Sequence, residues 1–412
     1  MPIITPEYNL YNWSDLNFPT IEPSLKLDFA NARALDPRIT FTRASTATYV
    51  GKDGLIKTAG EDEARFDHDP VTGESLGLLI EEQRTNLYVN NHDPALGASG
   101  TATKTTVQIV LPSGETGPAL ETDASGFAQN YRNQTAGSNT APGYLTFYAK
   151  KKTSGSTGTL TITLEGGSTG RSFANIGINS DTWTKITHTH DWSLSNSTLR
   201  RFDAYLPTAN TSDSDTSFYL AFIQFEDGNF PTSYIPTSGA QATRSTDVAR
   251  ILGESFKSFH NFTEHSLLVD YVLDKNAQLK SPLGTNQVRF CDAGGGGTNG
   301  GNGYSLRVVT NPTSPQIDAH GNYDFLTHFD SAGFNLSDGV NEYKVAMGFA
   351  LNDQSFVSGS IVQIDTNVPL PNTQTVSIER LVIGEIPTKV HYKKIVYYSK
   401  RLANTQLQTL TQ

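Results

Sequence analysis

Residues that could bind a metal ion occur in two short stretches. His188 and His190 flank a threonine, so on a strand both rings lie on one face, beside Asp191. Asp213 and Asp215 belong to an alternating run of oxygen-bearing side chains, a donor pattern that suits Ca²⁺. The run lacks the full twelve-residue loop and its terminal glutamate. A polar strand face and a solvated acidic turn are the simpler interpretations. We expect no cofactor, with Ca²⁺ at Asp213 and Asp215 as the one alternative.

Catalytic carboxyl pairs are the second kind of site to consider. A glycan-cleaving enzyme needs two acids across a cleft, roughly 5–10 Å apart. The local candidates are Glu81-Glu82, Glu61-Asp62-Glu63 and Asp67 with Asp69. Adjacent residues on a strand point to opposite faces, which counts against a pair such as Glu81 and Glu82. The sequence also lacks an H-E-x-x-H signature. We predict that the protein is not an enzyme, although acids distant in sequence could still meet.

Aromatic side chains that could stack on sugars form the third group. Sandwich proteins that bind glycans use exposed tryptophan or tyrosine rings, because a ring face packs on a pyranose. The stronger candidates for stacking on a sugar are Trp192, Tyr304 and Tyr323, and the weaker ones are Trp183 and Tyr205. Packing into a core is the competing interpretation for each of them. Trp192 lies in a turn-like stretch and is the least core-like.

Composition and charge exclude several classes of protein. The 412 residues carry a net charge of −10, with 31 basic and 41 acidic residues, so we expect no nucleic-acid partner. Cys291 is the only cysteine, which excludes a disulfide framework within the chain. No stretch resembles a signal peptide or a transmembrane helix, so we expect no membrane insertion.

Hydrophobic alternation predicts an all-β fold. Apolar and polar residues alternate with period two in many short runs that turn residues separate. Asp53-Gly54 lies between two such runs and is a hairpin signal. The principal predicted strands are 39–43, 47–50, 55–57, 76–80, 105–110, 143–149, 158–164, 183–188, 218–225, 266–272, 304–309, 343–349, 360–365 and 390–398. Their spacing is typical of antiparallel β-sandwiches or jelly rolls.

The same pattern suggests five segments. Residues 1–24 are an extended arm, in which Tyr8, Tyr11, Trp13 and Phe18 need a surface to bury against. Packing of this arm on the protein's own domain and anchoring of the arm on another protein are equally good interpretations. Residues 25–94 form a small β module, 95–240 a jelly roll, 241–252 a polar linker and 253–412 a second sandwich. The leucines of 401–410 predict a short closing helix, with Asn404 as its N-cap.

Two groups of short sequence segments, which we call the phrases, resemble structural proteins of tailed bacteriophages, namely head spikes, head fibres and tail fibres. One group comprises Leu27–Ala30, Asp36–Tyr49 and Leu79–Leu87, and the other is Phe225–Thr237. The strand order of 95–240 also resembles carbohydrate-binding-module-like jelly rolls. A late strand followed by a leucine-containing helix resembles the end of concanavalin- or laminin-G-like domains.

The resemblance implies a virion protein made in the host cytoplasm. Its N-terminal region would attach to capsid, neck or tail proteins, and its sandwiches would adhere to a host-surface glycan. A homo-oligomer, with a trimer favoured, is implied by the resemblance alone. A glycan-degrading tailspike and a cellular carbohydrate-binding protein are the alternatives. Head and tail locations both fit the two groups of phrases.

Overall fold

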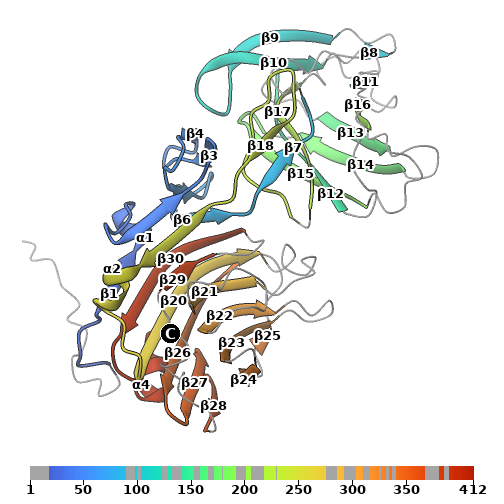
Figure 1. Ribbon diagram of the computed structural model, residues 1–412. Coiled ribbons are helices and arrows are strands. Elements are labelled where there is room, and N and C mark those ends of the chain that lie inside the picture. The colour runs from blue at the N-terminus through green and yellow to red at the C-terminus, as the bar shows by residue number, and fades with distance from the viewer. Residues whose placement is uncertain are drawn as a thin grey trace, which may run out of the picture.

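The protein consists of two β lobes joined at a narrow waist (Figure 1). The computed structural model describes residues 18–89, 98–99, 104–122, 129–130, 142–152, 158–165, 171–178, 180–191, 201–205, 218–228, 230–274, 285–291, 303–309, 316–323, 326–330, 334–335, 340–366, 380–384 and 389–412. The lower lobe contains the C-terminus and the upper lobe contains the middle of the chain. Among the described residues, no helix is both long and apolar enough to cross a membrane.

Two large antiparallel sheets form the lower lobe. Sheet A has the order β28-β27-β26-β20-β30-β6-β5, with β1 also pairing to β30. Sheet B has the order β2-β19-β29-β21-β22-β23-β24, with β25 pairing to β23. The bounds in sheet A are β1 Leu25–Asp28, β5 Arg65–His68, β6 Ser75–Glu81, β20 Glu264–Asp274, β26 Val340–Ala350, β27 Asp353–Ser358, β28 Ile361–Asp365 and β30 Lys389–Tyr398. Those in sheet B are β2 Ile39–Thr42, β19 Val248–Leu252, β21 Thr285–Cys291, β22 Gly303–Val309, β23 Gln316–Tyr323, β24 Leu326–Asp330, β25 Phe334–Asn335 and β29 Arg380–Ile383.

The core of the lower lobe lies between these sheets. Along β20, Leu267, Val269 and Tyr271 are buried in one cluster, because alternate residues of a strand share a face. Ile251 and Leu381 of sheet B belong to the same cluster. The sandwich therefore has a continuous apolar interior to which both sheets contribute.

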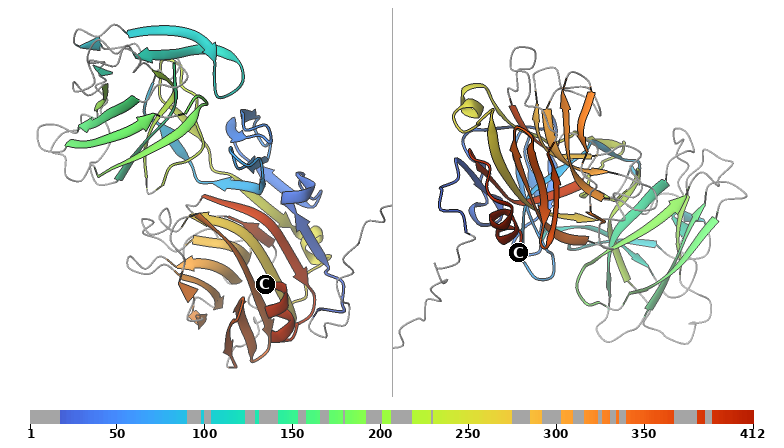
Figure 2. Two further views of the ribbon diagram at one scale, coloured as in Figure 1. Left: turned by 180° about the vertical axis from the view of Figure 1, so that it is seen from behind. Right: turned by 90° about the horizontal axis from the view of Figure 1, so that it is seen from below.

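Three short helices among the described residues lie against the lower lobe. They are α1 Phe29–Ala32, α2 Gly253–Lys257 and α4 Asn404–Leu410. Leu407 of α4 packs in a cluster with Val357 and Tyr398, so this helix covers sheet A (Figure 2). The closing helix is confirmed, but its predicted N-cap is wrong, because Ala403 is the cap residue and Asn404 is already helical. Gln406 accepts a hydrogen bond from the Ala403 backbone N–H at 3.0 Å, so the helix start is satisfied from within.

The upper lobe is built on a five-stranded sheet with the order β15-β12-β17-β10-β9. Its core includes Leu145, Phe147 and Leu220, which are buried together. Two smaller sheets, β14-β13-β16 and β11-β8, complete the described part of this lobe. The bounds are β8 Ala98–Ser99, β9 Lys104–Val110, β10 Thr116–Thr122, β11 Gln129–Asn130, β12 Pro142–Lys151, β13 Gly158–Glu165, β14 Arg171–Ile178, β15 Thr184–Asp191, β16 Arg201–Tyr205 and β17 Phe218–Asp227.

Two strand pairs lie at the waist. β7 (Arg84–Asn86) pairs with β18 (Ala242–Arg244), and both run between the lobes in Figure 1. The hairpin of β3 (Ala47–Val50) and β4 (Ile56–Ala59) lies beside them. Ile56 of this hairpin packs with Phe222 and Tyr234. The hairpin that Asp53-Gly54 predicts is therefore present, and it is fastened to the upper lobe.

The all-β fold class is confirmed, with most described strands at their predicted places. The strand pairings nevertheless connect segments that the sequence analysis separated. β1 and β6 pair with β30, and β2 pairs with β19. Residues 25–94 thus supply strands to the C-terminal sandwich. The stretch 241–252, predicted as a polar linker, contains the strands β18 and β19.

Candidate functional site

Most of the predicted site residues lie outside the described part of the chain. This holds for Tyr8, Tyr11, Trp13, Trp192, Asp213 and Asp215. Tyr304 and Tyr323 lie on neighbouring strands β22 and β23, whose backbone alone is described. Their roles in glycan or metal binding stay predictions. Phe18 of the arm is 49% exposed, so its anchoring role also stays a prediction.

Two weaker candidates are described in more detail. Trp183 donates its indole N–H to the Val110 carbonyl at 2.8 Å, and the Lys150 ammonium lies 4.9 Å from its ring centre. This ring is therefore already engaged with its own lobe. His188 lies on β15, and burial lowers the pKa of its imidazole. Among the described residues, no group of three metal-ligating side chains comes together.

The most highly organised polar site is a buried charge network at the waist, which we call the joint. Arg65 donates to Glu81 and to the Thr48 carbonyl, at 2.8 Å and 2.9 Å, and it also pairs with Asp247. Arg43 pairs with Asp247 at 3.0 Å. These side chains are at most 1% exposed. Charges buried this deeply persist only when they are paired and hydrogen-bonded, as here.

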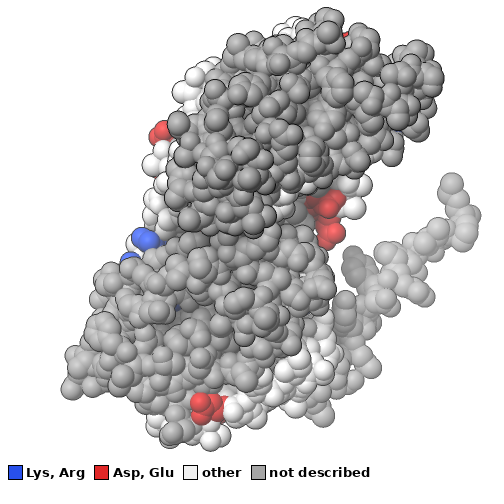
Figure 3. Space-filling model, turned by 90° about the vertical axis from the view of Figure 1, so that its right-hand side faces the viewer, with Lys and Arg blue, Asp and Glu red and all other residues white. Residues whose placement is uncertain are grey.

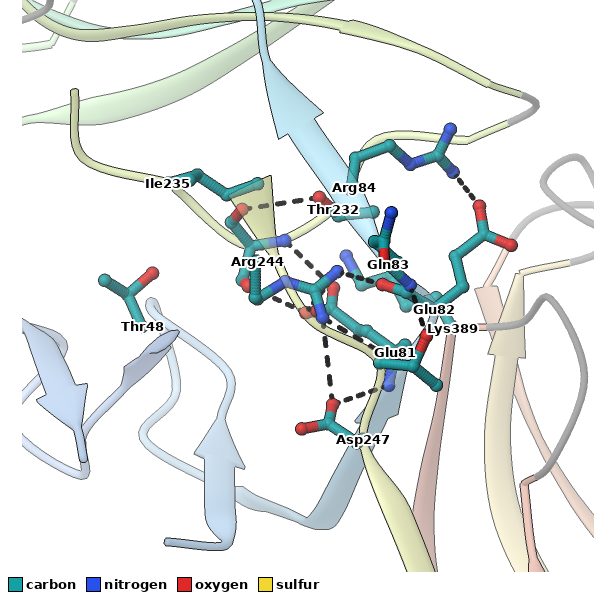
Figure 4. Close-up of polar contacts among 12 residues, drawn as sticks. Thr48, Glu81, Glu82, Gln83, Arg84, Thr232, Ile235, Arg244, Asp247 and Lys389 are labelled. Atoms are coloured by element: carbon teal, nitrogen blue, oxygen red, sulfur yellow. Dashed lines mark hydrogen bonds and ion pairs between the residues drawn. The ribbon is translucent and has the colours of Figure 1, made fainter. Parts of the chain in front are cut away.

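Residues distant in sequence supply the remaining contacts of the joint. Arg244, the last residue of β18, lies 3.6 Å from Glu81 and 3.9 Å from Asp247 (Figure 4). The Glu81 backbone N–H donates to the Asp247 carboxylate at 2.8 Å. Burial alone raises the pKa of Glu81, but the charges of Arg244 and Arg65 hold it well below its usual value. Glu81 therefore stays ionised and is unsuited to act as a proton donor.

The two groups of phrases from the sequence meet at this joint. Ser233 of the second group donates its backbone N–H and its hydroxyl to the Glu81 carboxylate, at 2.9 Å and 2.7 Å. Asn86 of the first group accepts the Phe225 N–H at 3.0 Å and donates to the Ile235 carbonyl at 2.9 Å. The phrases are therefore the two complementary sides of one structural contact.

Within the second phrase, a carboxylate organises the loop that follows β17. Glu226 is fully buried and accepts the Thr232 backbone N–H at 2.8 Å and the Thr232 hydroxyl at 2.7 Å. Arg84 crosses this loop, donates to the Asp227 carbonyl and lies 4.9 Å over the Phe230 ring. Gly228 has φ +143°, and a Cβ there would lie 1.1 Å from Arg84. Only glycine leaves space for that guanidinium.

A local irregularity brings the upper lobe onto the hairpin. The pairing of β12 with β17 shifts register between Thr146 and Tyr148, and Phe222 has a positive φ of 54°. Such a bulge re-aims the side chain. The Phe222 ring stacks on Tyr234 with centroids 4.3 Å apart. The bulge thus adds an apolar contact, between Phe222 and Tyr234, beside the charge network.

A second polar site is an open groove of about 460 Å³ on sheet A. Asp270, Glu342 and Lys393 lie along it. Burial, and then the charge of Glu342, raises the pKa of Asp270 to about 6. The two carboxyl groups interact directly, so they lack the gap of about 5 Å or more that glycosidases use. The Lys393 ammonium in turn pairs with Glu342.

The joint was missed in the sequence because burial is invisible there. Arg43, Glu81 and Arg84 belong to the phrases, but charged residues are rarely interior, so nothing in the sequence marks these three as buried. The side chains of the adjacent residues Glu81 and Glu82 lie in different surroundings, as expected for neighbours that point to opposite faces. Glu82 pairs with Arg84 on the more exposed side. On the face drawn in Figure 3, the described acidic and basic side chains lie apart and form no large patch of one sign.

Comparison with known proteins adds only partial similarities. No protein family and no curated protein matches the sequence. A sialidase of Trypanosoma rangeli in complex with the inhibitor DANA matches at 15% identity and a TM-score of 0.29, covering 40% of this chain and 26% of its own. Domain 4 of AbnA, a GH43 extracellular arabinanase from Geobacillus stearothermophilus in complex with arabinotriose, matches at 12% identity and TM-score 0.29, covering 44% and 82%. The CBM22-1 xylan-binding domain of Paenibacillus barcinonensis Xyn10C matches at 13% identity and TM-score 0.25, covering 35% and 92%.

These proteins are carbohydrate-binding or glycan-active, and the match spans about a quarter of the sialidase's length. At such low TM-scores the similarities are confined to pieces of β architecture. The function is therefore argued from the joint and from the phrases that form it.

Proposed function

We propose that this chain is a structural protein of a tailed-phage particle that displays β-sandwiches for adhesion to a host-surface glycan. The observation that carries the proposal is the joint, because the phrases that resemble spike and fibre proteins form its two sides. A spike or fibre must hold its outer domain at a set distance from its attachment point. A buried joint with paired charges suits this role, since each pairing has one geometry.

The chemistry of the joint supports a non-enzymatic role. Glu81 and Asp247 are fully buried and engaged by arginines, so neither is accessible to a substrate. The arm at residues 1–24 and the strands of 25–94 would carry attachment to capsid, neck or tail proteins. A homo-oligomer, with a trimer favoured, is part of the proposal.

Immunogold labelling of intact virions with an antibody against residues 253–412 tests the virion role. Label on the capsid supports a head spike or decoration protein, and label at the tail tip supports an adsorption fibre. Absence of label from every particle would refute the virion role. A glycan array probed with the purified full-length chain then tests adhesion separately.

A glycan-degrading tailspike is the second candidate, and the raised pKa of Asp270 is the observation that favours it. Its second carboxyl group would have to be one other than Glu342, which interacts directly with Asp270. Asp270 is the described acid whose pKa, about 6, best suits a general acid. This candidate predicts that the chain shortens a capsular polysaccharide and that Asp270→Asn abolishes the shortening. Unchanged polymer length after prolonged incubation with the wild-type chain would exclude it.

A further inference from the structure

A small cavity lies where the two lobes and the β3–β4 hairpin meet. Its volume is about 50 Å³, enough for one small ion or a few water molecules. Tyr148 and Lys185 line it from the upper lobe, and Asp67 and Lys389 from sheet A. Tyr234, from the second phrase, closes it beside Glu81. Any ligand here would touch both lobes at once.

The hydroxyl of Tyr234 is an unused hydrogen-bond donor in this cavity. The residue is 7% exposed, and its hydroxyl has no hydrogen-bond partner among the described residues. Its backbone carbonyl accepts the Thr48 hydroxyl at 2.6 Å, and its ring stacks on Phe222, so the side chain is held in place. A buried hydroxyl without a partner costs about 1–3 kcal/mol. The position therefore calls for an acceptor within the cavity.

Two lysines from opposite lobes add positive charge. The Lys389 ammonium donates to the Pro231 carbonyl at 3.3 Å, which leaves further donor capacity. Burial, and next the charge of Lys185, lowers the pKa of Lys389. Both side chains therefore bring positive charge to the cavity, Lys185 from its exposed side.

The acceptors that face the cavity are already occupied. The Asp67 carboxylate accepts the Val50 N–H at 2.6 Å and lies 2.8 Å from the His391 ring nitrogen. The Glu81 carboxylate is engaged by Arg65 and Ser233, as described above. The hydroxyl of Tyr234 and the remaining donor capacity of Lys389 are therefore the groups in this cavity that an added acceptor would satisfy.

We propose that the cavity binds one small inorganic anion of the halide class, held by Lys389, Lys185 and Tyr234. The anion accepts a hydrogen bond from the tyrosine hydroxyl and lies beside the ammonium group of Lys389. Because its ligands come from both lobes, the anion strengthens the contact between them. The rigidity of the protein then depends on the anion concentration.

Thermal unfolding of the full-length chain tests this proposal. Sodium chloride is exchanged for sodium gluconate at constant ionic strength, because gluconate is too large for the cavity. We expect Tm to rise with chloride concentration, as linkage requires of a ligand that binds the folded state. We also expect ³⁵Cl resonance broadening that disappears in Lys389→Met. Tyr234→Phe keeps the stacked ring and should weaken the apparent chloride affinity about tenfold, the equivalent of one hydrogen bond.

Lys393→Met is the matched control. Lys393 lies on the same strand, β30, but its ammonium pairs with Glu74 and Glu342 on the open groove. This variant should keep the chloride dependence of the wild type. Equal Tm values in chloride and gluconate, without line broadening, would mean that the cavity holds water only and would overturn the proposal. Wild-type chloride dependence in Tyr234→Phe and Lys389→Met would also overturn it, by placing the anion elsewhere.

Discussion

Replacing Arg65 by methionine should loosen the joint more than any exposed charge replacement. Arg65 is fully buried and pairs with both Glu81 and Asp247. Its removal leaves Glu81 with Arg244 at 3.6 Å and Asp247 with Arg43 at 3.0 Å. Breaking a buried ion pair from one side costs about 3–5 kcal/mol, because the remaining charge stays out of water.

The loss is best measured locally by amide hydrogen exchange. Peptides that cover residues 81–87 and 225–237 report on the two sides of the joint, including the Ser233 N–H that donates to Glu81. At about 1.4 kcal/mol per factor of ten, their protection should fall by roughly 10² to 4 × 10³. Protection in the core of the lower sandwich, such as β20, should change much less.

Arg38→Met is the matched control. Arg38 also pairs with an aspartate, Asp36 at 2.8 Å, but its side chain is 31% exposed. Exposed pairs contribute about 0–1 kcal/mol, so this variant should behave almost as the wild type. If Arg65→Met lost no more protection than Arg38→Met, the interpretation of the joint as a network that fixes the lobes would be wrong.

Two further predictions concern a glycine and a histidine. Gly228→Ala should destabilise the protein by more than about 2 kcal/mol, because the new Cβ would meet Arg84. Gly239→Ala, at φ +75° with no atom within 4 Å of the new Cβ, should cost only about 1 kcal/mol. Urea denaturation of both variants measures the two free energies of unfolding, and equal losses would contradict the prediction. Burial lowers the pKa of His260 to about 3, so unfolding takes up a proton below pH 6.5, and stability should fall by about 1.4 kcal/mol per pH unit from there towards pH 3. His260→Gln should flatten this acid dependence in denaturation midpoints measured from pH 7 to pH 4, and a variant with the wild-type slope would assign the effect to other groups.

Local sequence patterns were sufficient for the fold class and for most described strands. Alternation predicted the strand at 47–50, and Asp53-Gly54 predicted its hairpin, because both signals depend only on neighbouring residues. The start of the last helix was misplaced by one residue. There Gln406 reaches back to the Ala403 backbone, a contact that does not require a polar cap.

Partners distant in sequence could not be predicted in the same way. Asp247 belongs to a polar stretch interpreted as a linker, yet it is fully buried because Arg43 and Arg65 surround it. These partners lie more than 180 residues away. The sequence does not show whether a charged residue will meet an opposite charge in the interior of the fold.

The amino-acid sequence by itself determined that this protein is all-β, acidic and free of internal disulfides, since composition and period-two alternation are local properties. Only the tertiary structure decided that the two groups of phrases meet, and that Glu81 is a buried anchor for Ser233 rather than an exposed acid. The physical reason is that strand pairing and charge burial depend on which segments share an interior. That choice is made by the free energy of the whole fold and not by any short stretch of the chain.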